Sequence, residues 1–568
     1  MPAAMTEPLV ECVPNFSEGR DQATIDAITQ AITEVDGVML LDVDPGRATN
    51  RTVVTFVGSP EPVLEAAVRA ARVAAQRIDM RKHHGEHPRF GALDVCPLVP
   101  VSGISMGETV ALAHRLAARL GEEVGLSVYC YEQAALHPDR KNLATVRAGE
   151  YEGLQARIAA GHVPDFGPKA FQPQTGATAV GARDFLLAYN VNLNTTSTRR
   201  ANAIAFDVRE KGRQRLDPAT MKPVLGDDGQ PIWDPGSLHA VKGIGWYIDE
   251  YGVAQVSLNL TDISITPLHL AFDEVVKKAD ARGVRVTGSE LVGLVPLRAM
   301  LDAGRYFLEK QERSLGVSDD ELLKIAVKSL GLDDLYPFRP EEKIVEYAIA
   351  KKSGASKKLL VDRSLRGFVE ETASESPAPG GGSVAAALGA LGGALAAMVA
   401  NLSAHKRGWD ARWREFSDWA EQGKHSYAKL LSLVDEDTRA FDAVMAAFGL
   451  HKGTAEEKAA RKAAIERANL EAALVPLEVM RQALASMDVI AAMAEHGNPA
   501  SVSDAGVGAL CARSAVLGAE LNVRINCAQL ADREQASSLV GEASRIAQEA
   551  VAREREILAL VAKRIDAG

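Results

Sequence analysis

In the first half of the chain, short apolar runs alternate with longer segments in which apolar residues recur at helical spacing. Runs rich in valine and leucine, bounded by proline, glycine or polar residues, predict strands, and spacing of three to four residues predicts amphipathic helices. The predicted strands are 9–13, 38–44, 51–58 and 93–101, and the predicted helices are 15–32 and 60–78. This β-α-β-β-α-β order predicts an α+β subdomain of the ferredoxin-like kind.

The same pattern recurs further along the chain and predicts a second subdomain of this kind, facing the first across a cleft. Its predicted elements are a strand at 184–193, a helix at 197–212, a hairpin at 243–262 with Gly252 in the turn, a helix at 267–283 and a strand within 284–296. Residues 163–181, rich in glycine and proline, are expected to form neither helix nor strand and to lie at the cleft. Residues 213–241 are expected to be a surface excursion.

After two further predicted helices, at 318–331 and 340–350, the texture of the sequence changes. Residues 351–358, KKSGASKK, are small, polar and basic, which is typical of a linker. From about residue 362 to the end the chain shows only Ala-rich helical periodicity, which predicts an all-α bundle. The predicted fold is therefore multidomain, with two tandem α+β ferredoxin-like (βαββαβ) subdomains followed by an all-α helical bundle.

Residues 383–403, SVAAALGALGGALAAMVANLS, carry no charge over about the length that crosses a bilayer. They are mostly alanine and glycine, so the segment is only weakly lipophilic. It predicts a tightly packed bundle helix and no membrane span.

The composition favours a soluble globular protein, with 47% hydrophobic and 24% charged residues in 568. A net charge of -11 argues against nucleic-acid binding, which needs a basic face. The five cysteines are scattered and none are spaced as CxxC, which indicates reduced thiols in a cytoplasm. The segment MPAAMTEPLVECV has no basic and apolar leader pattern, so no secretory signal is expected.

Three histidines, His83, His84 and His87, lie within KHHGEHPRFGALDVCPLVPV, residues 82–101. The spacing of His83 and His87 suits a metal only on a helix, and Gly85 and Pro88 argue against a helix there. A solvated polar loop and a catalytic base remain as alternatives. A base is favoured because imidazole transfers protons near neutral pH, and His87 lies nearest the rigid strand.

Two segments of the predicted bundle carry candidate chemistry. In PAPGGGSV, residues 377–384, three glycines precede Ser383 at a helix start, where free N–H groups could hold an anion or a polar ring. The alternative is a plain loop with Ser383 as the N-cap. In SLVDEDTRAFDAV, residues 432–444, Asp435 and Asp437 point to different sides of a predicted helix, so one could face a cleft. The alternative there is a solvated acidic patch.

These segments, taken together, resemble the bifunctional formimidoyltransferase-cyclodeaminase family. The matching segments are VECVPNFSEGR (10–20), LLDVDPG with NRTVVTFVG (40–58), GEHPRFGALDVCPLVPV (85–101), VPDFGP (163–168), KGIGWYI (242–248), SELVGLVPL (289–297), APGGGSV (378–384), SLVDEDTRAF (432–441) and GNPASVSD to LNVRIN (497–526). They follow the family's order and cover nearly the whole chain.

The resemblance implies two reactions. A transferase would move the formimino group of N-formimino-L-glutamate to N5 of tetrahydrofolate, and a cyclodeaminase, an ammonia-lyase, would convert the product to 5,10-methenyltetrahydrofolate. It implies His87 as the transferase base and Asp437 as the cyclodeaminase carboxylate. It also implies a folate contact at Asp207, where the family usually has asparagine. The implied folate-binding loop is Gly167, Pro168, Lys169, Ala170, Phe171, Gln172, Pro173, Gln174, Thr175 and Gly176. The turn expected to bind substrate in the bundle is Gly380, Gly381, Gly382 and Ser383.

The expected organisation is a transferase of two subdomains (1–183 and 184–350), a linker (351–361) and a helical cyclodeaminase (362–568). Tetrahydrofolate, with one or more glutamates in its tail, is expected as a substrate, with no metal and no redox cofactor. The chain is expected to be cytoplasmic and homo-oligomeric, with small-molecule partners and no nucleic acid. The alternatives are a transferase whose helical domain only binds folate and drives assembly, and a non-catalytic folate carrier.

Overall fold

The computed structural model describes residues 8–47, 49–85, 88–352, 359–376 and 378–567. The chain divides into two compact units. The sheet unit comprises the described parts of 2–303 and 327–355. The helical unit comprises 304–326 together with the described part of 356–568. Sheet-containing domains followed by a helical region were predicted from the sequence and are confirmed.

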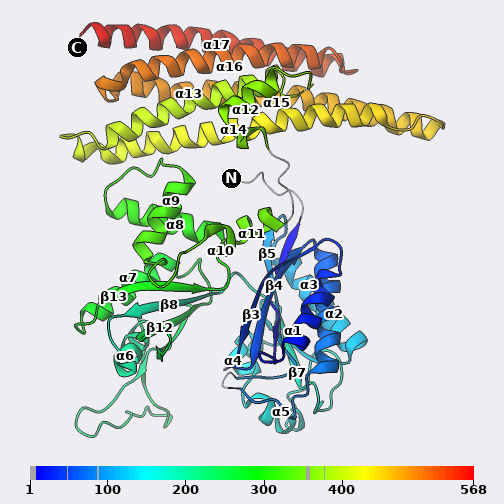
Figure 1. Ribbon diagram of the computed structural model, residues 1–568, viewed down its shortest axis with the longest axis vertical. Helices are drawn as coiled ribbons and strands as arrows, with labels where there is room; N and C mark the ends of the chain where they lie inside the picture. The colour runs from blue at the N-terminus through cyan, green and yellow to red at the C-terminus, as the bar shows by residue number, and fades with distance from the viewer. Residues whose placement is uncertain (1–7, 48, 86–87, 353–358, 377, 568) are drawn as a thin grey trace. The chain divides into compact units, whose positions relative to one another are not determined.

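A seven-stranded sheet forms the first part of the sheet unit (Figure 1). Its strands are β1 (Leu9–Cys12), β2 (Asn15–Phe16), β3 (Val38–Gly46), β4 (Arg51–Gly58), β5 (Leu93–Ser102), β6 (Ser127–Glu132) and β7 (Ala177–Ala182). β3 is paired with β4, and the remaining order is β1-β4-β2-β5-β7-β6. β5, β7 and β6 run parallel, whereas the other pairs are antiparallel.

β6 was not predicted from the sequence, and β7 corrects the expectation that residues 163–181 hold no strand. The residues of β7, ATAVGA, are all buried between β5 and β6. A strand of alanine, glycine and threonine resembles a turn in composition, although small side chains are what a fully covered inner strand can accommodate.

Alternation along these strands divides the sheet into two faces. Val10, Cys12 and Phe56 belong to the buried core with residues of α1 (Gln22–Thr33), α2 (Pro60–Arg77) and α3 (Met106–Arg119). Their alternating neighbours, such as Glu11 and Thr55, line a cavity on the other face. Shorter helices complete this part: η1 (Leu120–Val124), η2 (Pro138–Arg140), α4 (Leu143–Val146) and α5 (Glu150–Ala159).

A four-stranded antiparallel sheet follows, in the order β11-β12-β8-β13. Its elements are β8 (Leu187–Leu193), α6 (Thr198–Val208), β11 (Val241–Ile248), β12 (Val253–Leu260), α7 (Leu268–Asp280) and β13 (Val286–Val292). The predicted hairpin is confirmed, and Gly252 has a φ of 66° in its turn, a conformation that favours glycine. The predicted excursion forms a small ribbon of β9 (Arg213–Gln214) and β10 (Trp233–Asp234). The unit ends with α10 (Pro340–Lys343) and α11 (Val345–Lys352).

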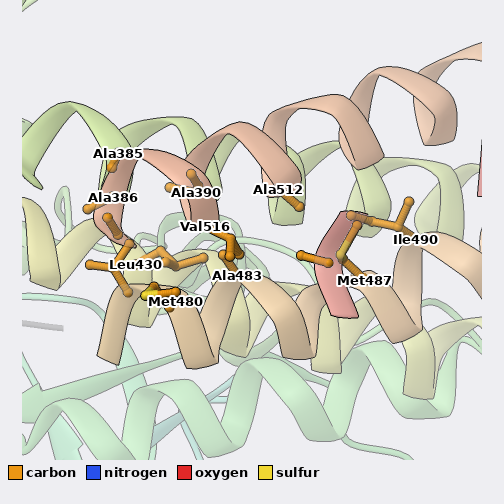
Figure 2. Close-up of a cluster of buried hydrophobic side chains, with 14 of the residues drawn as sticks. Ala385, Ala386, Ala390, Leu430, Met480, Ala483, Met487, Ile490, Ala512 and Val516 are labelled. Atoms are coloured by element: carbon orange, nitrogen blue, oxygen red, sulfur yellow. The ribbon is translucent and has the colours of Figure 1, made fainter. Parts of the chain in front are cut away.

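The helical unit is a bundle of long helices (Figure 1). They are α13 (Gly381–Ala404), α14 (Trp413–Gly449), α15 (Ala455–His496), α16 (Val502–Cys527) and α17 (Arg533–Asp566). Shorter elements are η3 (Leu360–Asp362), α12 (Leu365–Thr372), η4 (Asp410–Arg412) and η5 (Pro499–Ser501). Alanines of α13 and α16 pack against larger residues such as Leu430 and Met480 in the buried core (Figure 2).

α13 is long and apolar enough to cross a membrane by length and composition. It packs against α14, α15 and α16, and 61% of its most apolar window is buried in the bundle. Gly392 lies so close to α16 that an added Cβ would be 2.9 Å from the carbonyl oxygen of Gly508.

The end of α8 (Leu297–Lys310) and most of α9 (Asp319–Leu330) belong to the helical unit. The turn between them is hydrogen-bonded to the bundle, because the backbone N–H of Leu315 donates to Ser417 Oγ at 3.0 Å. The ammonium of Lys424 also lies 2.6 Å from Asp319 Oδ1. The bundle therefore includes a helical hairpin that precedes the predicted linker in the sequence.

Candidate active sites

The sheet unit contains a cavity of about 460 Å³. Its walls come from the cavity-facing side of the seven-stranded sheet and from β8, β12 and β13. Three arginines (Arg51, Arg147 and Arg183) and three carboxylates (Glu11, Asp42 and Asp44) are among the lining residues. A cavity lined by both charges can hold a ligand that itself carries both.

Two of these arginines share one buried carboxylate. Arg51 Nη1 lies 2.6 Å from Asp94 Oδ2, Arg147 Nη2 contacts the same oxygen, and Asp94 is fully buried. The backbone N–H of Phe90 donates to Asp94 Oδ1 at 3.0 Å. Arg51 also donates to Asn15 Oδ1, at 2.6 and 3.0 Å. Burial lowers the pKa of Arg51 to about 10, so the side chain stays protonated at neutral pH.

Glu11 is the most deeply buried carboxylate of the cavity lining, at 4% exposure. Burial raises its pKa to about 7, although the nearby Arg183 opposes this shift. Burial also raises the pKa of Asp44. Perturbed carboxyls in a polar cavity are typical of functional sites.

The histidine-rich segment lies against residues 49–51, beside this cavity. Nε2 of the buried His83 is 2.8 Å from the carbonyl oxygen of Asn50, and Asn50 Nδ2 donates to the carbonyl of His84 at 3.0 Å. A Cβ on Gly85 would lie 2.2 Å from the carbonyl oxygen of Thr49, which lines the cavity. His84 is exposed.

His87, the predicted base, lies outside the described residues. Within the described part of the chain, no group of three or more His, Cys, Asp or Glu side chains is arranged to hold a metal ion. Burial lowers the pKa of His83, which favours its neutral form.

The predicted folate loop, Gly167 to Gly176, is hydrogen-bonded to the backbone before and after the three histidines in the sequence. The backbone N–H of Met80 donates to the carbonyl of Gln174 at 2.9 Å, and that of Ala92 donates to the carbonyl of Thr175 at 2.8 Å. Phe171 packs on Tyr151, with ring centroids 5.6 Å apart, and the Tyr151 hydroxyl donates to the carbonyl of Pro173 at 2.5 Å. None of the ten loop residues belongs to the described lining of the cavity.

The remaining loop residues are held locally. Lys169 Nζ donates to the carbonyl of Asp165 at 3.1 Å, and Ser127 Oγ donates to the carbonyl of Pro168 at 2.8 Å. Gln172 Nε2 donates to the carbonyl of Ala170 at 3.2 Å.

Asp207, the predicted folate contact, lies near the end of α6. Its carboxylate forms ion pairs with Arg213 and Arg282, and its backbone carbonyl accepts from the N–H of Ser237 at 2.9 Å. These contacts hold the base of the excursion against α6 and explain an acidic residue here through its arginine partners.

In the helical unit, the two motif segments meet. Ser383, in the first turn of α13, donates from its hydroxyl to Asp437 Oδ2 of α14 at 2.9 Å. A Cβ on Gly382 would lie 2.1 Å from Asp437 Oδ1, so the turn and the carboxylate are in direct contact. The helix N-cap is Gly380 rather than Ser383, which makes the N-cap alternative for Ser383 wrong.

The carboxylate of Asp437 experiences opposing effects. Burial raises its pKa, and hydrogen bonds from the side chain and backbone of Ser383 act in the opposite direction, with burial the larger effect. The result is a carboxyl with raised basicity at the positive end of a helix, where anions and polar groups bind well.

The neighbours of Asp437 have other partners. Asp435 accepts from the backbone N–H of Leu360 at 2.7 Å and thereby fixes η3 on α14. Glu436 lies in a groove of about 510 Å³ between α14 and α15, near Lys429 and Arg439. Within the described residues, Asp437 is the one of these three carboxylates for which a contact with the glycine-rich turn is seen.

Several site residues were missed in the sequence. Around Asp437, Thr438 Oγ1 lies 3.4 Å from Ser383 Oγ, and the Asn522 amide lies 3.4 Å from where a Cβ of Gly381 would be. In the sheet unit the buried Glu11 and Asp94 were missed. Both lie within apolar runs, where a lone carboxylate is a usable signal because burying one unpaired is costly.

Comparison with known proteins finds relatives of both halves of the chain. Three family models match the chain: the N-terminal subdomain of the formiminotransferase domain (residues 9–183), the formiminotransferase domain (188–350) and formiminotransferase-cyclodeaminase (364–545). The formimidoyltransferase-cyclodeaminase of Rattus norvegicus is 46% identical over 543 residues, covering 94% of this chain and 96% of the relative.

Two shorter relatives match one half of the chain each. The glutamate formimidoyltransferase of Streptococcus pyogenes is 38% identical and covers 54% of this chain and 94% of its own length. The methenyltetrahydrofolate cyclohydrolase of Methylorubrum extorquens is 37% identical and covers 36% of this chain and 99% of its own length. Because the similarity extends over nearly the full length of the chain and all three family models match, the chain belongs to the formimidoyltransferase-cyclodeaminase family.

Proposed function

We propose that the chain is a bifunctional enzyme that transfers the formimino group of N-formimino-L-glutamate to N5 of tetrahydrofolate and then forms 5,10-methenyltetrahydrofolate with release of ammonia. The observation that carries this proposal is that each unit has its own polar site, built from the motifs of a different half-reaction: the charged cavity beside the histidine-rich segment, and Asp437 at the start of α13.

In the transfer reaction, N5 of tetrahydrofolate attacks the formimino carbon and gives a tetrahedral intermediate. N5 loses a proton, and the nitrogen of the departing glutamate gains one. His87 takes the first proton and supplies the second, which an imidazole can do near neutral pH. The loop Gly167 to Gly176 and Asp207 are the proposed folate contacts, and the hydrogen bonds of the loop to residues 80 and 92, on either side of the histidines in the sequence, support the assignment of the loop.

In the cyclisation, N10 attacks the amidinium carbon of 5-formiminotetrahydrofolate and ammonia leaves. The N10 proton must reach the departing nitrogen. Asp437 carries it, since its raised pKa makes it a better base than an ordinary aspartate. Gly380, Gly381, Gly382 and Ser383 bind the substrate through the N–H groups at the helix start.

The finer assignments follow from the same proposal. Residues 1–183 and 184–350 make the transferase, 351–361 the linker and 362–568 the cyclodeaminase, which is a lyase. Both sheets derive from the ferredoxin-like βαββαβ pattern, which the antiparallel order β11-β12-β8-β13 supports. Tetrahydrofolate, with one or more tail glutamates, is a substrate, and neither step needs a metal or redox cofactor. α13 acts as a core helix, and the protein works in the cytoplasm as a homo-oligomer.

A paired assay tests the proposal against its alternatives. Glutamate release and the absorbance of methenyltetrahydrofolate are followed in the same reaction. The bifunctional enzyme gives both signals. A transferase with a purely folate-binding helical domain gives glutamate and accumulates 5-formiminotetrahydrofolate. A carrier gives neither signal, and either of these two results would overturn the proposal.

A further inference from the structure

Resting on the transferase function proposed above, we infer that Arg147 and Arg183 bind the carboxylates of the formimino donor in the sheet-unit cavity, and that the buried Asp94 is the positioning residue for Arg147. The chemistry recognised is a dicarboxylate that also carries a cationic amidinium group. N-formimino-L-glutamate has this combination of charges.

The guanidinium group of Arg147 has N–H groups without an acceptor among the described residues. It is the C-cap residue of α4 and lines the cavity, and among the described residues its guanidinium hydrogen-bonds only to Asp94. Its Nε is buried without an acceptor in the described part of the chain. A buried charged donor without an acceptor is unfavourable, and a carboxylate is the acceptor that guanidinium groups match best.

Asp94 fixes this guanidinium and leaves excess positive charge. Its single negative charge is shared by Arg51 and Arg147, which meet on the same oxygen. Its other oxygen is occupied by the backbone N–H of Phe90. Among the described residues, two cations share this one carboxylate, which leaves a net positive charge at this part of the cavity wall, where weak solvation strengthens the attraction of an anion.

Arg183 supplies a second cation. Its Nη1 donates to the carbonyl of Asp184 at 2.9 Å, and its charge acts on Glu11 of the same cavity, whose pKa it lowers. Because the pKa of Glu11 is raised to about 7, this carboxyl is only partly ionised near neutral pH and neutralises Arg183 incompletely. Because Arg183 and Arg147 line the same cavity, a second carboxylate of the ligand can pair with Arg183.

The acidic residues of the same cavity indicate which ligand fits. Asp42 and Asp44 project from β3 into the cavity, and Asp44 lies diagonally across from Arg51, because its pairing partner on β4 is Val53. Carboxylates here suit the amidinium of the formimino donor. The glutamate tail of a folate also has carboxylates, but it has no cation for Asp42 and Asp44 to bind. The charge pattern thus favours the formimino donor over the folate tail.

The test uses the full-length protein and two substrates. Arg147→Gln should raise KM for N-formimino-L-glutamate about 10- to 100-fold, the effect of losing a charge-assisted hydrogen bond. The KM values for tetrahydrofolate with one and with five tail glutamates should stay within about 3-fold. Inhibition by the product L-glutamate should weaken in parallel. Arg115→Gln, which removes an exposed arginine of α3 that pairs with Glu61, is the matched control and should change none of these values.

Asp94 is tested by rescue and by coupling. Asp94→Asn should raise the same KM with kcat within about 3-fold, and the Arg147→Gln/Asp94→Asn double variant should be no worse than the poorer single variant, since both act on one contact. Asp94→Glu should restore part of the loss. Arg147→Lys keeps the charge and provides a second variant in case Arg147→Gln does not fold. Cyclisation of supplied 5-formiminotetrahydrofolate checks that the helical unit of each variant is folded.

A rise confined to the KM of the five-glutamate folate would overturn the inference and assign the arginines to the tail. An unchanged KM for both substrates would also overturn it. Failure of the proposed transferase function can be distinguished from failure of this inference, because the parent protein itself would then release no glutamate. Calorimetric titration with L-glutamate gives a readout without turnover, and loss of binding in Arg147→Gln but not in Arg115→Gln is the expected result.

Discussion

A Cβ atom on Gly382 would lie 2.1 Å from Oδ1 of Asp437, so the proposed catalytic carboxylate occupies the space that any larger side chain at residue 382 would need. Gly382→Ala should therefore displace the carboxylate. Misplacing a catalytic group by about 1 Å can cost about 10²-fold in rate. We expect cyclisation of supplied 5-formiminotetrahydrofolate to fall by about this factor, with glutamate release unchanged.

Gly541→Ala is the matched control for this variant. Gly541 is an exposed residue of α17, and an added Cβ would meet nothing within 4 Å. Alanine is also the better helix former, so this variant should keep full activity and gain up to about 1 kcal/mol of stability. Normal cyclisation in Gly382→Ala would mean that the position of Asp437 is not critical.

The two half-reactions should separate by mutation. His87→Ala should lower glutamate release by about 10²–10⁴-fold, the usual cost of losing a positioned general base, and leave cyclisation intact. Asp437→Asn should do the reverse, with 5-formiminotetrahydrofolate accumulating. Stopped assays of glutamate, the formimino intermediate and the methenyl product give the required table of variants against half-reactions.

The exposure of His83 and His84 decides which of them is a useful control for His87→Ala. His84 is exposed, so His84→Ala should retain at least about a third of the parent activity. His83 is buried, and its Nε2 lies 2.8 Å from the carbonyl oxygen of Asn50, so His83→Ala should lower the thermal stability. A loss of activity in His83→Ala would therefore not show that His83 takes part in catalysis. Full glutamate release in His87→Ala, or a large loss in His84→Ala, would require a different base.

Glu11 predicts a pH-dependent stability. Its pKa rises from the ordinary 4.5 to about 7 on folding, so the folded state binds the proton more tightly than the unfolded state. Its ionisation therefore costs nothing below about pH 4.5, and the cost grows to about 3 kcal/mol above pH 7. Glu11→Gln should raise the free energy of unfolding at pH 8 and change it little at pH 5. Denaturant unfolding of both proteins at the two pH values measures this, and an equal effect at both would be inconsistent with a raised pKa.

The linker is also testable. A specific protease site replacing residues 353–358 would cut the chain between the predicted halves. Residues 304–326 belong to the helical unit and carry contacts such as Arg305 to Glu421 at 2.8 Å and Lys424 to Asp319 at 2.6 Å. The cut fragments should therefore elute together in native size-exclusion chromatography and separate only in denaturant. Two independently eluting, active fragments would show that these contacts are dispensable.

Much of this architecture was predictable because strong periodicity decides the type of an element. The runs at 51–58 and 93–101 became β4 and β5, and the Ala-rich segment from 362 became a bundle. β7 was not predictable, since its residues favour a strand only when β5 and β6 cover both sides. The same holds for residues 304–326, whose assignment to the helical unit depends on tertiary contacts that local sequence does not encode.

In the candidate sites, too, the local motifs could be predicted from the sequence and the contacts between distant residues could not. Asp437 and the glycine-rich turn were recognised separately as motifs, and the structure brings them together. Asp207 was expected at a folate contact, but its two arginine partners lie on other elements and follow no local spacing. Asp94 stands out locally only as a lone carboxylate in an apolar run, because its partners, Arg51 and Arg147, lie far away in the sequence.

The hairpin at 304–326 has a consequence for how the protein is made. Two of its contacts on the bundle, Leu315 to Ser417 and Arg305 to Glu421, join residues 102 and 116 positions apart, so the hairpin leaves the ribosome before these partners exist. At about 5–20 residues per second, the wait lasts about 5–20 s. During that time the N–H of Leu315 lacks its Ser417 acceptor. The Leu315 side chain, which is buried in the folded protein, also lacks the part of its cover that the later residues supply. Residues 304–326 of the helical unit are therefore synthesised together with the sheet unit. They can complete their contacts only after the bundle helices have been made, so the folding of the two units is linked during synthesis.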